Sequence, residues 1–258
     1  MSAHTPFSLR PFRPLRATVT CWLLVAAFGA QAADPTSTTA ASKDPFEHVN
    51  RMTYRFNDAL DRHFLRPLAE GYRAHVPDPI RTGIANFVAN IEYPTVVIND
   101  ALQGKLVAAG QDVARFVVNT VVGIGGLGDP ASALHIPVHN EDFGQTLGHW
   151  GVPPGPYLVL PVLGSSDLRD APGWWVDAHT NIEHYARNQY TRWGIAGMSV
   201  FDIRVQGLAA DETIDNAFDP YAVVRDAYLA RRNYLVHDGN VATEDTGYDI
   251  VDDETTTE

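Results

Sequence analysis

The feature that most limits how this chain can fold is a long uncharged stretch in its middle. Between positions 116 and 166 only Asp129, Glu141 and Asp142 carry formal charge, and the part from 143 to 166, FGQTLGHWGVPPGPYLVLPVLGSS, carries none. That part is long enough to cross a bilayer, but its five glycines and four prolines are incompatible with a spanning helix of about 20 residues. Composition alone favours a buried, glycine-rich hairpin in a core. The alternative is irregular backbone that lines a cavity at membrane depth.

Elsewhere, apolar residues recur at helical spacing. One helix is predicted from 46 to 76, with a kink or interruption at Pro67; its apolar stripe consists of Val49, Met52, Phe56, Leu60, Phe64, Leu68 and Tyr72. Further helices are predicted at Pro79–Ile91, Lys105–Val122 and Pro220–Val236, the last with Asp219 as its N-cap. Strand-like alternation is scarce, so the sequence predicts an all-α fold.

Both ends of the chain differ from this helical part. Three arginines precede the apolar run CWLLVAAFGA, and Ala30-Gln31-Ala32 fits a signal-peptidase site, so residues 1–32 are predicted to be a cleavable signal peptide. Residues 33–43 form a small, polar linker, and residues 238–258 hold eight acids and no base; both are predicted to be disordered. The folded domain is therefore expected at 44–237.

Charge and cysteine content exclude several classes of function. Without the signal peptide the chain keeps 16 basic and 31 acidic residues, a formal charge of −15, which argues against nucleic acid as a partner. Cys21 is the only cysteine and lies within the predicted signal, so the mature chain has neither disulfide nor thiol chemistry. Because Cys21 precedes the apolar run and lacks a small-residue approach, it is not expected to be a lipidation site.

The stretch NTVVGIGGLGDPA has the Gly123, Gly125, Gly128 spacing of a dinucleotide-binding loop. That fingerprint needs a strand before it, a helix after it and an acid about 20 positions on, and none of these is clear here. The residues upstream have helical period instead. The glycines are therefore predicted to end a helix, and no cofactor is expected.

Catalytic and metal-binding motifs are weak. Asp142-Phe143-Gly144 imitates a kinase motif without the other kinase signatures. The best group of candidate metal ligands is His135, His139, Glu141 and Asp142, but Pro137 keeps the histidines off one helix face, and no metal is expected. Ser165, Ser166, Asp167 and His149 are available for hydrolysis, yet no motif marks a nucleophile.

Arginine outnumbers lysine in the mature chain, and a guanidinium recognises phosphate with two parallel hydrogen bonds. Phospholipid headgroups are thus conceivable ligands for Arg51, Arg66, Arg73, Arg115, Arg231 and Arg232. For most of them the simpler interpretation is pairing along a helix face, as between Glu47 and Arg51.

Several long motifs in the folded part resemble one family, MlaA, also called VacJ, which maintains lipid asymmetry of the outer membrane. The resemblance covers nearly the whole folded region through DPFEHVNRMTYRFNDALD, RPLAEGYRAHVPDPIRTGIANFVANI, ALQG, RFVVNTVVGIGGLGDPA, EDFGQTLGHWGVPPGPYLVLPVLGSSDLRD and DPYAVVRDAYLARRNYLVHDG. It implies a ring-shaped bundle of amphipathic helices in the inner leaflet of the outer membrane, with a Gly/Pro-rich hairpin lining a central amphipathic channel.

The resemblance also implies a function without chemistry: mislocalised phospholipid leaves the outer leaflet through the channel and passes to a periplasmic carrier protein, while an outer-membrane porin trimer supports the ring. A periplasmic lipid-acting hydrolase stays as the alternative. The family is normally lipidated, and this signal departs from it in lacking the acylation site. The protein is expected at the periplasmic face of the outer membrane, held without an acyl anchor.

This implied function assigns three sets of candidate residues. The channel and hairpin candidates are Gly123, Gly125, Gly126, Phe143, Leu147, Trp150, Val152, Tyr157 and Leu160. The gating candidates are Asn50, Phe56 and Asn57. The headgroup candidates are Arg51, Arg115, Arg231 and Arg232.

Overall fold

A computed structural model of the chain describes residues 44–240, all within one compact unit, Thr39–Glu258. The predicted signal peptide and linker, and the tail from position 241 onward, lie outside the described residues. The first residues expected in the tail are described: Asp238 pairs with the ammonium group of Lys105.

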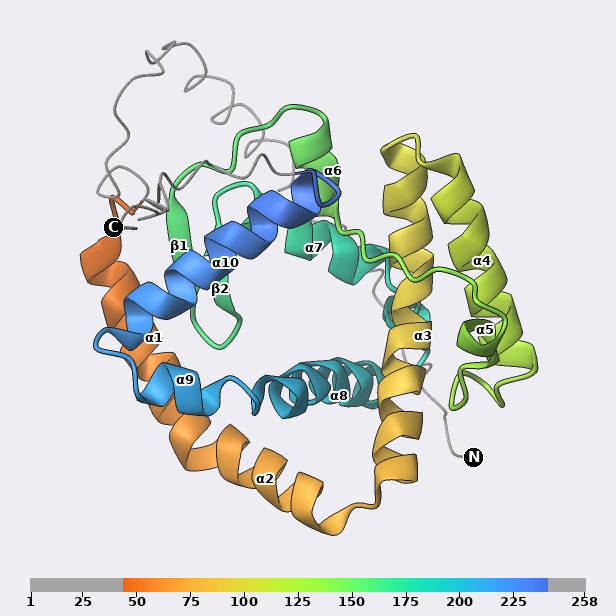
Figure 1. Ribbon diagram of the computed structural model, residues 1–258, viewed down its shortest axis with the longest axis horizontal. Helices are drawn as coiled ribbons and strands as arrows, with labels where there is room; N and C mark the ends of the chain where they lie inside the picture. Colours follow the sequence, from red (N-terminus) through yellow and green to blue (C-terminus); the bar gives the residue numbers. More distant parts are fainter. Residues whose placement is uncertain (1–43, 241–258) are drawn as a thin grey trace, which may run out of the picture. The chain divides into compact units, whose positions relative to one another are not determined.

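The described part is mostly helical, as predicted (Figure 1). Its elements in chain order are α1 (Glu47–Leu60), the π-helix η2 (Asp61–Leu65), α2 (Arg66–His75), α3 (Asp78–Leu102), α4 (Leu106–Val121), α5 (Pro130–Ala133), α6 (Phe143–His149), β1 (Tyr157–Leu160), β2 (Gly164–Asp167), α7 (Asp170–Thr180), the 3-10 helix η3 (Ile182–Tyr185), α8 (Gln189–Gly207), α9 (Asp211–Asp215) and α10 (Pro220–Val236). Strands β1 and β2 form an antiparallel hairpin that pairs Tyr157 with Asp167 and Leu160 with Gly164.

The first predicted helix is α1, η2 and α2 in succession, which we call the outer arc. Pro67 is the second residue of α2, and the widened π turn of η2 directly precedes that helix. Proline lacks an N–H, and its ring clashes with the carbonyl four residues earlier in a regular helix. An extra residue in the turn relieves this clash, so the helical path is interrupted without ending.

The prediction for the second helix was too short. Helix α3 does not end at Ile91 but continues through Pro94 to Leu102. Its last turns are buried, with Val96, Asn99 and Asp100 inside, and they pack against α4, α6 and α7. Tertiary packing there stabilises a helix that the internal proline would weaken on its own.

The other two predicted helices are confirmed within a residue. Helix α4 spans Leu106–Val121, and α10 begins at Pro220 with the Asp219 side chain accepting a hydrogen bond from the Ala222 N–H. Helices α7 and α8 and the β1–β2 hairpin were not predicted from periodicity. Helices α7 and α8 have a weaker apolar stripe than α1 and α4. Helix α8 is positioned by its packing on α2 and α3.

Packing contacts between elements run in a closed circuit. Helix α1 contacts β1, β2 contacts α10, α10 contacts α6, α6 contacts α3, α3 contacts α8, and α8 returns to α2. Figure 1 shows these elements following one another around the unit. We use the name packed block for α6, α10 and the β1–β2 hairpin together with α7, which contacts α6 and β2.

The apolar core is small and lies between the packed block and α1. Tyr157, Val159 and Tyr221 are buried, with Tyr54, Tyr228 and Leu229 packed against them. Many other buried side chains are polar, among them Asn50, Asn99, Gln145 and Thr146.

Candidate functional site

The outer arc turns its apolar stripe outward. Val49, Met52, Phe56, Phe64 and Leu68 are all 56–62% exposed, although they recur at the spacing of a core-facing stripe. A contiguous exposed apolar surface of this kind marks contact with a membrane or a partner.

The opposite face of α1 carries two asparagines, seven positions apart, that bind the hairpin. Asn50 is 2% exposed; its amide nitrogen donates to the Tyr157 carbonyl at 2.9 Å, and its oxygen accepts from the Val159 N–H at 3.0 Å. Asn57 repeats the pattern, donating to the Leu160 carbonyl at 2.9 Å and accepting from the Val162 N–H at 2.8 Å. Asn50 thus satisfies the free edge of β1 as a neighbouring strand would, and Asn57 holds the end of β1 and the turn after it.

The hairpin, α6, α7 and α10 surround a cavity of about 220 Å³. Its apolar lining comes from Leu160, Leu163 and Trp174, and its polar lining from Asp142, Ser165, Ser166, Asp170, Asp177, Tyr228 and Arg232. A lipid-sized molecule is far larger than this cavity, so the cavity can hold at most part of one.

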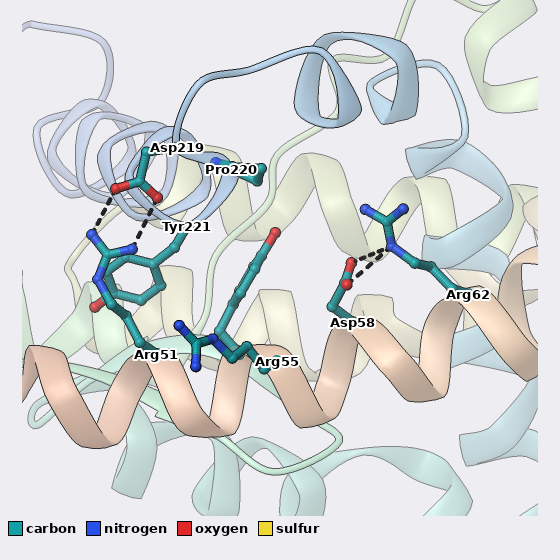
Figure 2. A pocket seen from close by; sticks show the side chains of 8 residues that line it. Arg51, Arg55, Asp58, Arg62, Asp219, Pro220 and Tyr221 are labelled. Carbon is teal, nitrogen blue, oxygen red and sulfur yellow. Dashed lines mark hydrogen bonds and ion pairs between the residues drawn. The ribbon is translucent and has the colours of Figure 1, made fainter.

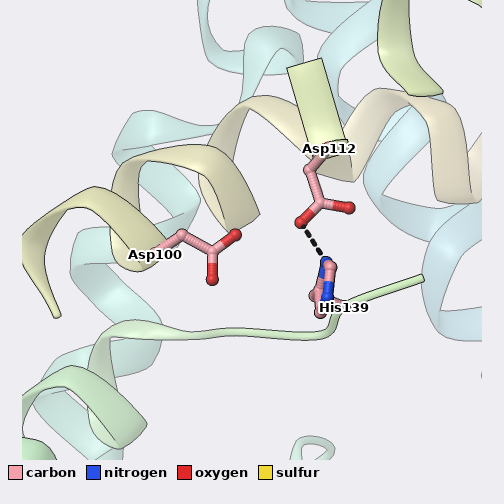
Figure 3. A group of neighbouring side chains, drawn as sticks. All are labelled: Asp100, Asp112 and His139. Atoms are coloured by element: carbon pink, nitrogen blue, oxygen red, sulfur yellow. Dashed lines mark hydrogen bonds and ion pairs between the residues drawn. The ribbon is translucent and has the colours of Figure 1, made fainter. Parts of the chain in front are cut away.

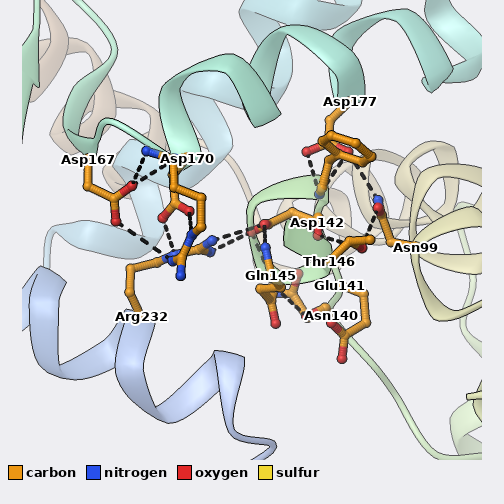
Figure 4. Close-up of polar contacts among 12 residues, drawn as sticks. Asn99, Asn140, Glu141, Asp142, Gln145, Thr146, Asp167, Asp170, Asp177 and Arg232 are labelled. Carbon is orange, nitrogen blue, oxygen red and sulfur yellow. Dashed lines mark hydrogen bonds and ion pairs between the residues drawn. The ribbon is translucent and has the colours of Figure 1, made fainter. Parts of the chain in front are cut away.

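Arg232 of α10 holds the polar side of this cavity together (Figure 4). Its guanidinium binds Asp142 through two nitrogens, at 2.5 and 3.0 Å, and its Nε lies 2.5 Å from Oδ2 of Asp170. Asp142 also caps α6 by accepting from the Gln145 N–H at 2.8 Å. Asp177 of α7 accepts hydrogen bonds from the Phe143 N–H and the Asn99 amide, which ties α7 to α6 and α3.

The acids around the cavity titrate differently. Burial raises the pKa of Asp177 to about 6 and outweighs the hydrogen bonds from Phe143 and Asn99. Burial likewise raises the pKa of Asp167 to about 6. Burial also opposes ionisation of Asp170, but the Arg169 hydrogen bond and the Arg232 charge outweigh it and lower the pKa of Asp170. The cavity wall thus combines an acid that stays ionised with one that gains a proton in mildly acidic solution.

A second cavity, also about 220 Å³, lies between α1 and the start of α10 (Figure 2). Arg51 binds Asp219 at 2.6 and 3.0 Å and stacks on the Tyr221 ring, and Arg62 binds Asp58 at 2.9 Å. Arg55 is exposed between these pairs and makes no ion pair with any residue in the 44–240 range. Its guanidinium is therefore available to an anion.

The glycines after α4 form a tight turn, as predicted. The N–H groups of Gly125 and Gly126 bind the Thr120 and Asn119 carbonyls, and the two residues have φ of 69° and 94°. A Cβ at Gly126 would lie 2.7 Å from Asn90, whereas one at Gly125 would meet no described atom within 4 Å. Apolar side chains surround the turn, and Ile124 is 80% exposed.

The remaining channel candidates lie at or near α6. Phe143 and Trp150 meet edge to face, and the Trp150 indole donates to the Leu102 carbonyl at 3.1 Å. Leu147 is half-buried and Val152 is exposed, whereas Tyr157 is fully buried in the core. The hairpin candidates and the glycine turn therefore occupy separate places on the fold.

Of the headgroup candidates, Arg51 and Arg232 are held in ion pairs as described above. Arg115 is 2% exposed and donates to Tyr93, the Ile136 carbonyl and Asp129. Arg231 is exposed and forms no ion pair with the described residues.

Among residues 44–240, no helix combines the length and the apolar composition needed to cross a membrane. The structure also separates the metal ligands considered from sequence. His139 contacts Asp112, Glu141 binds Gln103 and Lys105, and Asp142 binds Arg232.

Comparison with known proteins identifies the relatives of this fold. The family model described as MlaA lipoprotein matches residues 42–235. The chain belongs to the MlaA family.

Relatives that carry the name intermembrane phospholipid transport system lipoprotein MlaA include proteins of Shigella flexneri and Escherichia coli K12. The Shigella flexneri protein is 36% identical over 208 residues, which is 78% of this chain and 82% of the relative. The Escherichia coli K12 protein is 35% identical over the same length and shares. A solved structure described as "Structural basis for maintenance of bacterial outer membrane lipid asymmetry" is 36% identical, with a TM-score of 0.68 over 75% of this chain and 98% of that one.

Other glycines of this MlaA-family chain, not selected from the sequence, have a packing role. A Cβ at Gly144 of α6 would lie 2.4 Å from Asp170 Oδ1 and 2.7 Å from Arg232 Nη2, and one at Gly173 of α7 would lie 2.8 Å from the Gly144 nitrogen. These glycines let α6, α7 and the ion pair of α10 approach closely. One feature of the sequence could have indicated this close packing: the N-cap residue Asp142 is followed by Gly144 and Gly148, which lie about one helical turn apart.

Proposed function

We propose that this MlaA-family chain is a non-enzymatic conduit that removes mislocalised phospholipid from the outer leaflet of the outer membrane and delivers it to the periplasm. The observation that carries the proposal is the reversed polarity of the outer arc, with apolar side chains exposed and amides buried. Such a helix is stable with its apolar face among acyl chains and its polar face toward the protein. The relatives named for phospholipid transport support the same reading.

The lipid path proposed here runs beside the packed block. The cavity between the hairpin, α6, α7 and α10 offers apolar side chains beside polar ones, which suits a molecule with acyl chains and a charged headgroup. Phe143, Leu147, Trp150, Val152 and Leu160 remain candidates for its walls. Tyr157 is buried in the core and would hold the hairpin beside the path in place. A second part of the proposed path passes the turn of Gly123, Gly125 and Gly126 after α4, where apolar side chains are exposed.

The gate is proposed at α1. Asn50 and Asn57 attach this helix to β1 and to the turn after it, so α1 cannot move away from the hairpin without breaking four hydrogen bonds. Phe56 lies on the exposed side of the same helix, where acyl chains would meet it. A small displacement of α1 would change the opening beside the hairpin.

Headgroup contacts are proposed first for Arg231, which is exposed and unpaired among residues 44–240. Arg55, which the sequence analysis did not select, is the second choice for the same reason. Arg51, Arg115 and Arg232 would have to exchange an existing acidic partner for a phosphate.

The proposed partners are a porin trimer that supports the protein and a soluble periplasmic carrier that receives the lipid. The proposed location is the periplasmic face of the outer membrane, after export by the 1–32 signal and without an acyl anchor. A single acyl chain adds only marginal membrane affinity, so a wide apolar surface can replace it.

A hydrolytic function finds no support in the described part of the chain. The Ser165 hydroxyl bonds with Tyr157, and the Ser166 hydroxyl donates to the Asp167 carbonyl. Neither serine bonds a histidine of the described residues, so the side chains considered for hydrolysis do not form a nucleophile with its base.

The test compares Gly125→Asp with Gly125→Asn in cells that lack their own copy of the protein. Asp and Asn have the same size and tolerate the left-handed conformation of this turn, so the pair differs in charge alone. We expect Gly125→Asp to leave phospholipid in the outer leaflet and Gly125→Asn to clear it. A charge at apolar depth is unfavourable by roughly 2–4 kcal/mol.

Both variants must reach the outer membrane and co-purify with the same porin as the unchanged chain. Normal clearance by Gly125→Asp would remove this turn from the lipid path. Absence of any lipid phenotype when the whole gene is deleted would contradict the conduit itself.

A further inference from the structure

Three side chains with metal-binding atoms meet on the side of α3 that faces α4. Asp100 comes from the last turns of α3, Asp112 from α4, and His139 from the segment that precedes α6 (Figure 3). One ligand atom from each lies within 4.8 Å of the others, and His139 Nδ1 is 2.9 Å from Asp112 Oδ2. The three residues are far apart in sequence, so the fold creates the cluster.

Three of the four carboxylate oxygens of this cluster lack hydrogen-bond partners. Asp100 and Asp112 are both 0% exposed, and neither oxygen of Asp100 nor Oδ1 of Asp112 has a hydrogen-bond partner among the residues the structure describes. Buried carboxylates are usually hydrogen-bonded, ion-paired or bound to a metal, because desolvating a charge is expensive. Unpaired carboxylate oxygens that face each other therefore indicate a missing positive charge.

The nearby cations are bound elsewhere. The Lys105 ammonium pairs with Glu141 at 2.9 Å and with Asp238. Arg115, one turn along α4 from Asp112, directs its donors to Tyr93, Ile136 and Asp129. The imidazole of His139 contacts Asp112 through Nδ1, and it makes no such contact with Asp100.

We propose that Asp100, Asp112 and His139 bind one divalent transition-metal ion, with zinc as the best fit. Two carboxylates and one imidazole form a nitrogen and oxygen ligand set that suits zinc with a fourth position open to water. An ion of charge +2 neutralises the two carboxylates. Zinc ligand bonds of about 2.0–2.2 Å need ligand atoms roughly 3.3–3.6 Å apart, which small side-chain rotations within the cluster achieve. Calcium and magnesium favour oxygen ligands throughout, so the imidazole disfavours them.

A shared proton is the competing explanation for the cluster. Burial and the neighbouring Asp112 raise the pKa of Asp100 to about 7, so this pair can also lower its charge by holding a proton. Zinc needs both carboxylates and the imidazole without their protons, so zinc binding displaces protons and strengthens as pH rises.

The metal would fasten three segments together. It would join the end of α3 to α4 and fix the 135–142 segment that leads into α6 of the packed block. The apolar side chains of Leu106 and Val107, exposed at the start of α4, would then be held on a rigid support.

The experiment measures zinc binding to the full-length protein, purified in detergent through a tag without histidine and stripped with a chelator. Calorimetric titrations use zinc, manganese and calcium, and thermal unfolding is followed with and without zinc. The variants are His139→Gln and Asp100→Asn, and the matched control is His149→Gln, an exposed histidine of α6 outside the cluster.

We expect one zinc ion per chain, a higher Tm with zinc, and little binding of calcium. His139→Gln should weaken zinc binding by at least about 10-fold, because it removes a direct ligand, and His149→Gln should leave it unchanged. If His139→Gln misfolds, the zinc-dependent Tm of the unchanged protein still tests the proposal.

The proposal is overturned if the unchanged protein binds zinc only substoichiometrically and its Tm does not respond to zinc. It is also overturned if His139→Gln binds zinc as tightly as the unchanged chain. A Tm that rises in Asp100→Asn at pH 8, without any response of the unchanged protein to zinc, would assign the cluster to a shared proton. None of these outcomes depends on lipid transport.

Discussion

The outer arc and the packed block use opposite arrangements to bury their surfaces. In the outer arc, aliphatic and aromatic side chains of α1 and α2 are exposed, while Asn50 is buried against the hairpin. In the packed block, Tyr157 and Tyr221 are buried in the core, and charged side chains are enclosed around Arg232. The two regions of one chain thus bury opposite kinds of surface.

The difference teaches what periodicity can and cannot reveal. A 3.6-residue pattern shows that a helix has two unlike faces. It does not show whether the apolar face meets a core or lipid. In α1 that information lies in the polar face, because asparagines with specific backbone partners identify the side that faces the protein.

The largest loss of stability is expected for a substitution where α6 packs against α7. Gly144→Ala would place a Cβ 2.4 Å from Asp170 Oδ1 and disturb the pairing of Arg232, so we expect the free energy of unfolding to fall by about 3 kcal/mol. Urea unfolding measures it.

The control is Gly71→Ala in α2, where a Cβ would meet no described atom within 4 Å. This change should stabilise the protein by up to about 1 kcal/mol, since alanine favours helix. Equal effects at the two positions would contradict the distinction between the packed block and the outer arc.

The next effect is expected at the junction of the two regions. Asn50→Ala leaves the Tyr157 carbonyl and the Val159 N–H buried without partners, and it should lower the free energy of unfolding by about 2 kcal/mol. Asn57→Ala should have about half this effect, because Asn57 is only half-buried and water can replace its amide. A larger loss at Asn57 than at Asn50 would show that the junction depends on the hairpin turn more than on β1.

A smaller effect, limited to part of the pH range, is expected at Asp177. Its folded pKa, about 6, lies above the ordinary value of 3.8, so the folded protein holds this proton more tightly than the unfolded chain. Stability contributed by the protonated form is therefore lost as pH rises from about 4 through 6.

Asp177→Asn removes this group, so its free energy of unfolding should decline less between pH 4 and 7 than that of the unchanged protein. Asp226→Asn, an exposed acid of α10, is the control and should keep the original slope. Parallel curves for all three proteins would mean that Asp177 is as well solvated as a surface acid.

The smallest effect on stability is expected on the outer arc. Phe56→Gln should change the free energy of unfolding by no more than about 0.5 kcal/mol, because the ring is already more than half exposed. The same change should weaken association with membranes, which vesicle flotation measures. A loss of several kcal/mol would place Phe56 in a core and break the comparison.

The sequence predicts the helical class, α4, α10 and the glycine turn, because each depends on local signals such as an N-cap or a run of helical period. It places the end of α3 too early, since packing against α4, α6 and α7 carries that helix through Pro94. It gives no indication of α8, whose apolar residues do not gather on one face.

The candidate site was less predictable than the fold. The family resemblance supplied the hairpin and α1, but no local pattern reveals that Asn50 bonds the edge of β1 and that Asn57 bonds the turn after it. The interaction joins residues more than 100 positions apart. The Asp100, Asp112 and His139 cluster is likewise formed by folding. From the sequence no metal is expected, and His139 is grouped there with Glu141 and Asp142, whose side chains bind other partners in the structure.

The most direct test of the conduit uses a photo-crosslinking amino acid at three positions in cells. Leu163 lines the cavity of the packed block, Phe56 lies on the outer arc, and Glu212 is an exposed residue of α9. The account predicts phospholipid adducts at Leu163 and Phe56 and none at Glu212. Adducts at Phe56 without any at Leu163 would contradict it, because the protein would then sit in the membrane without carrying lipid past the hairpin.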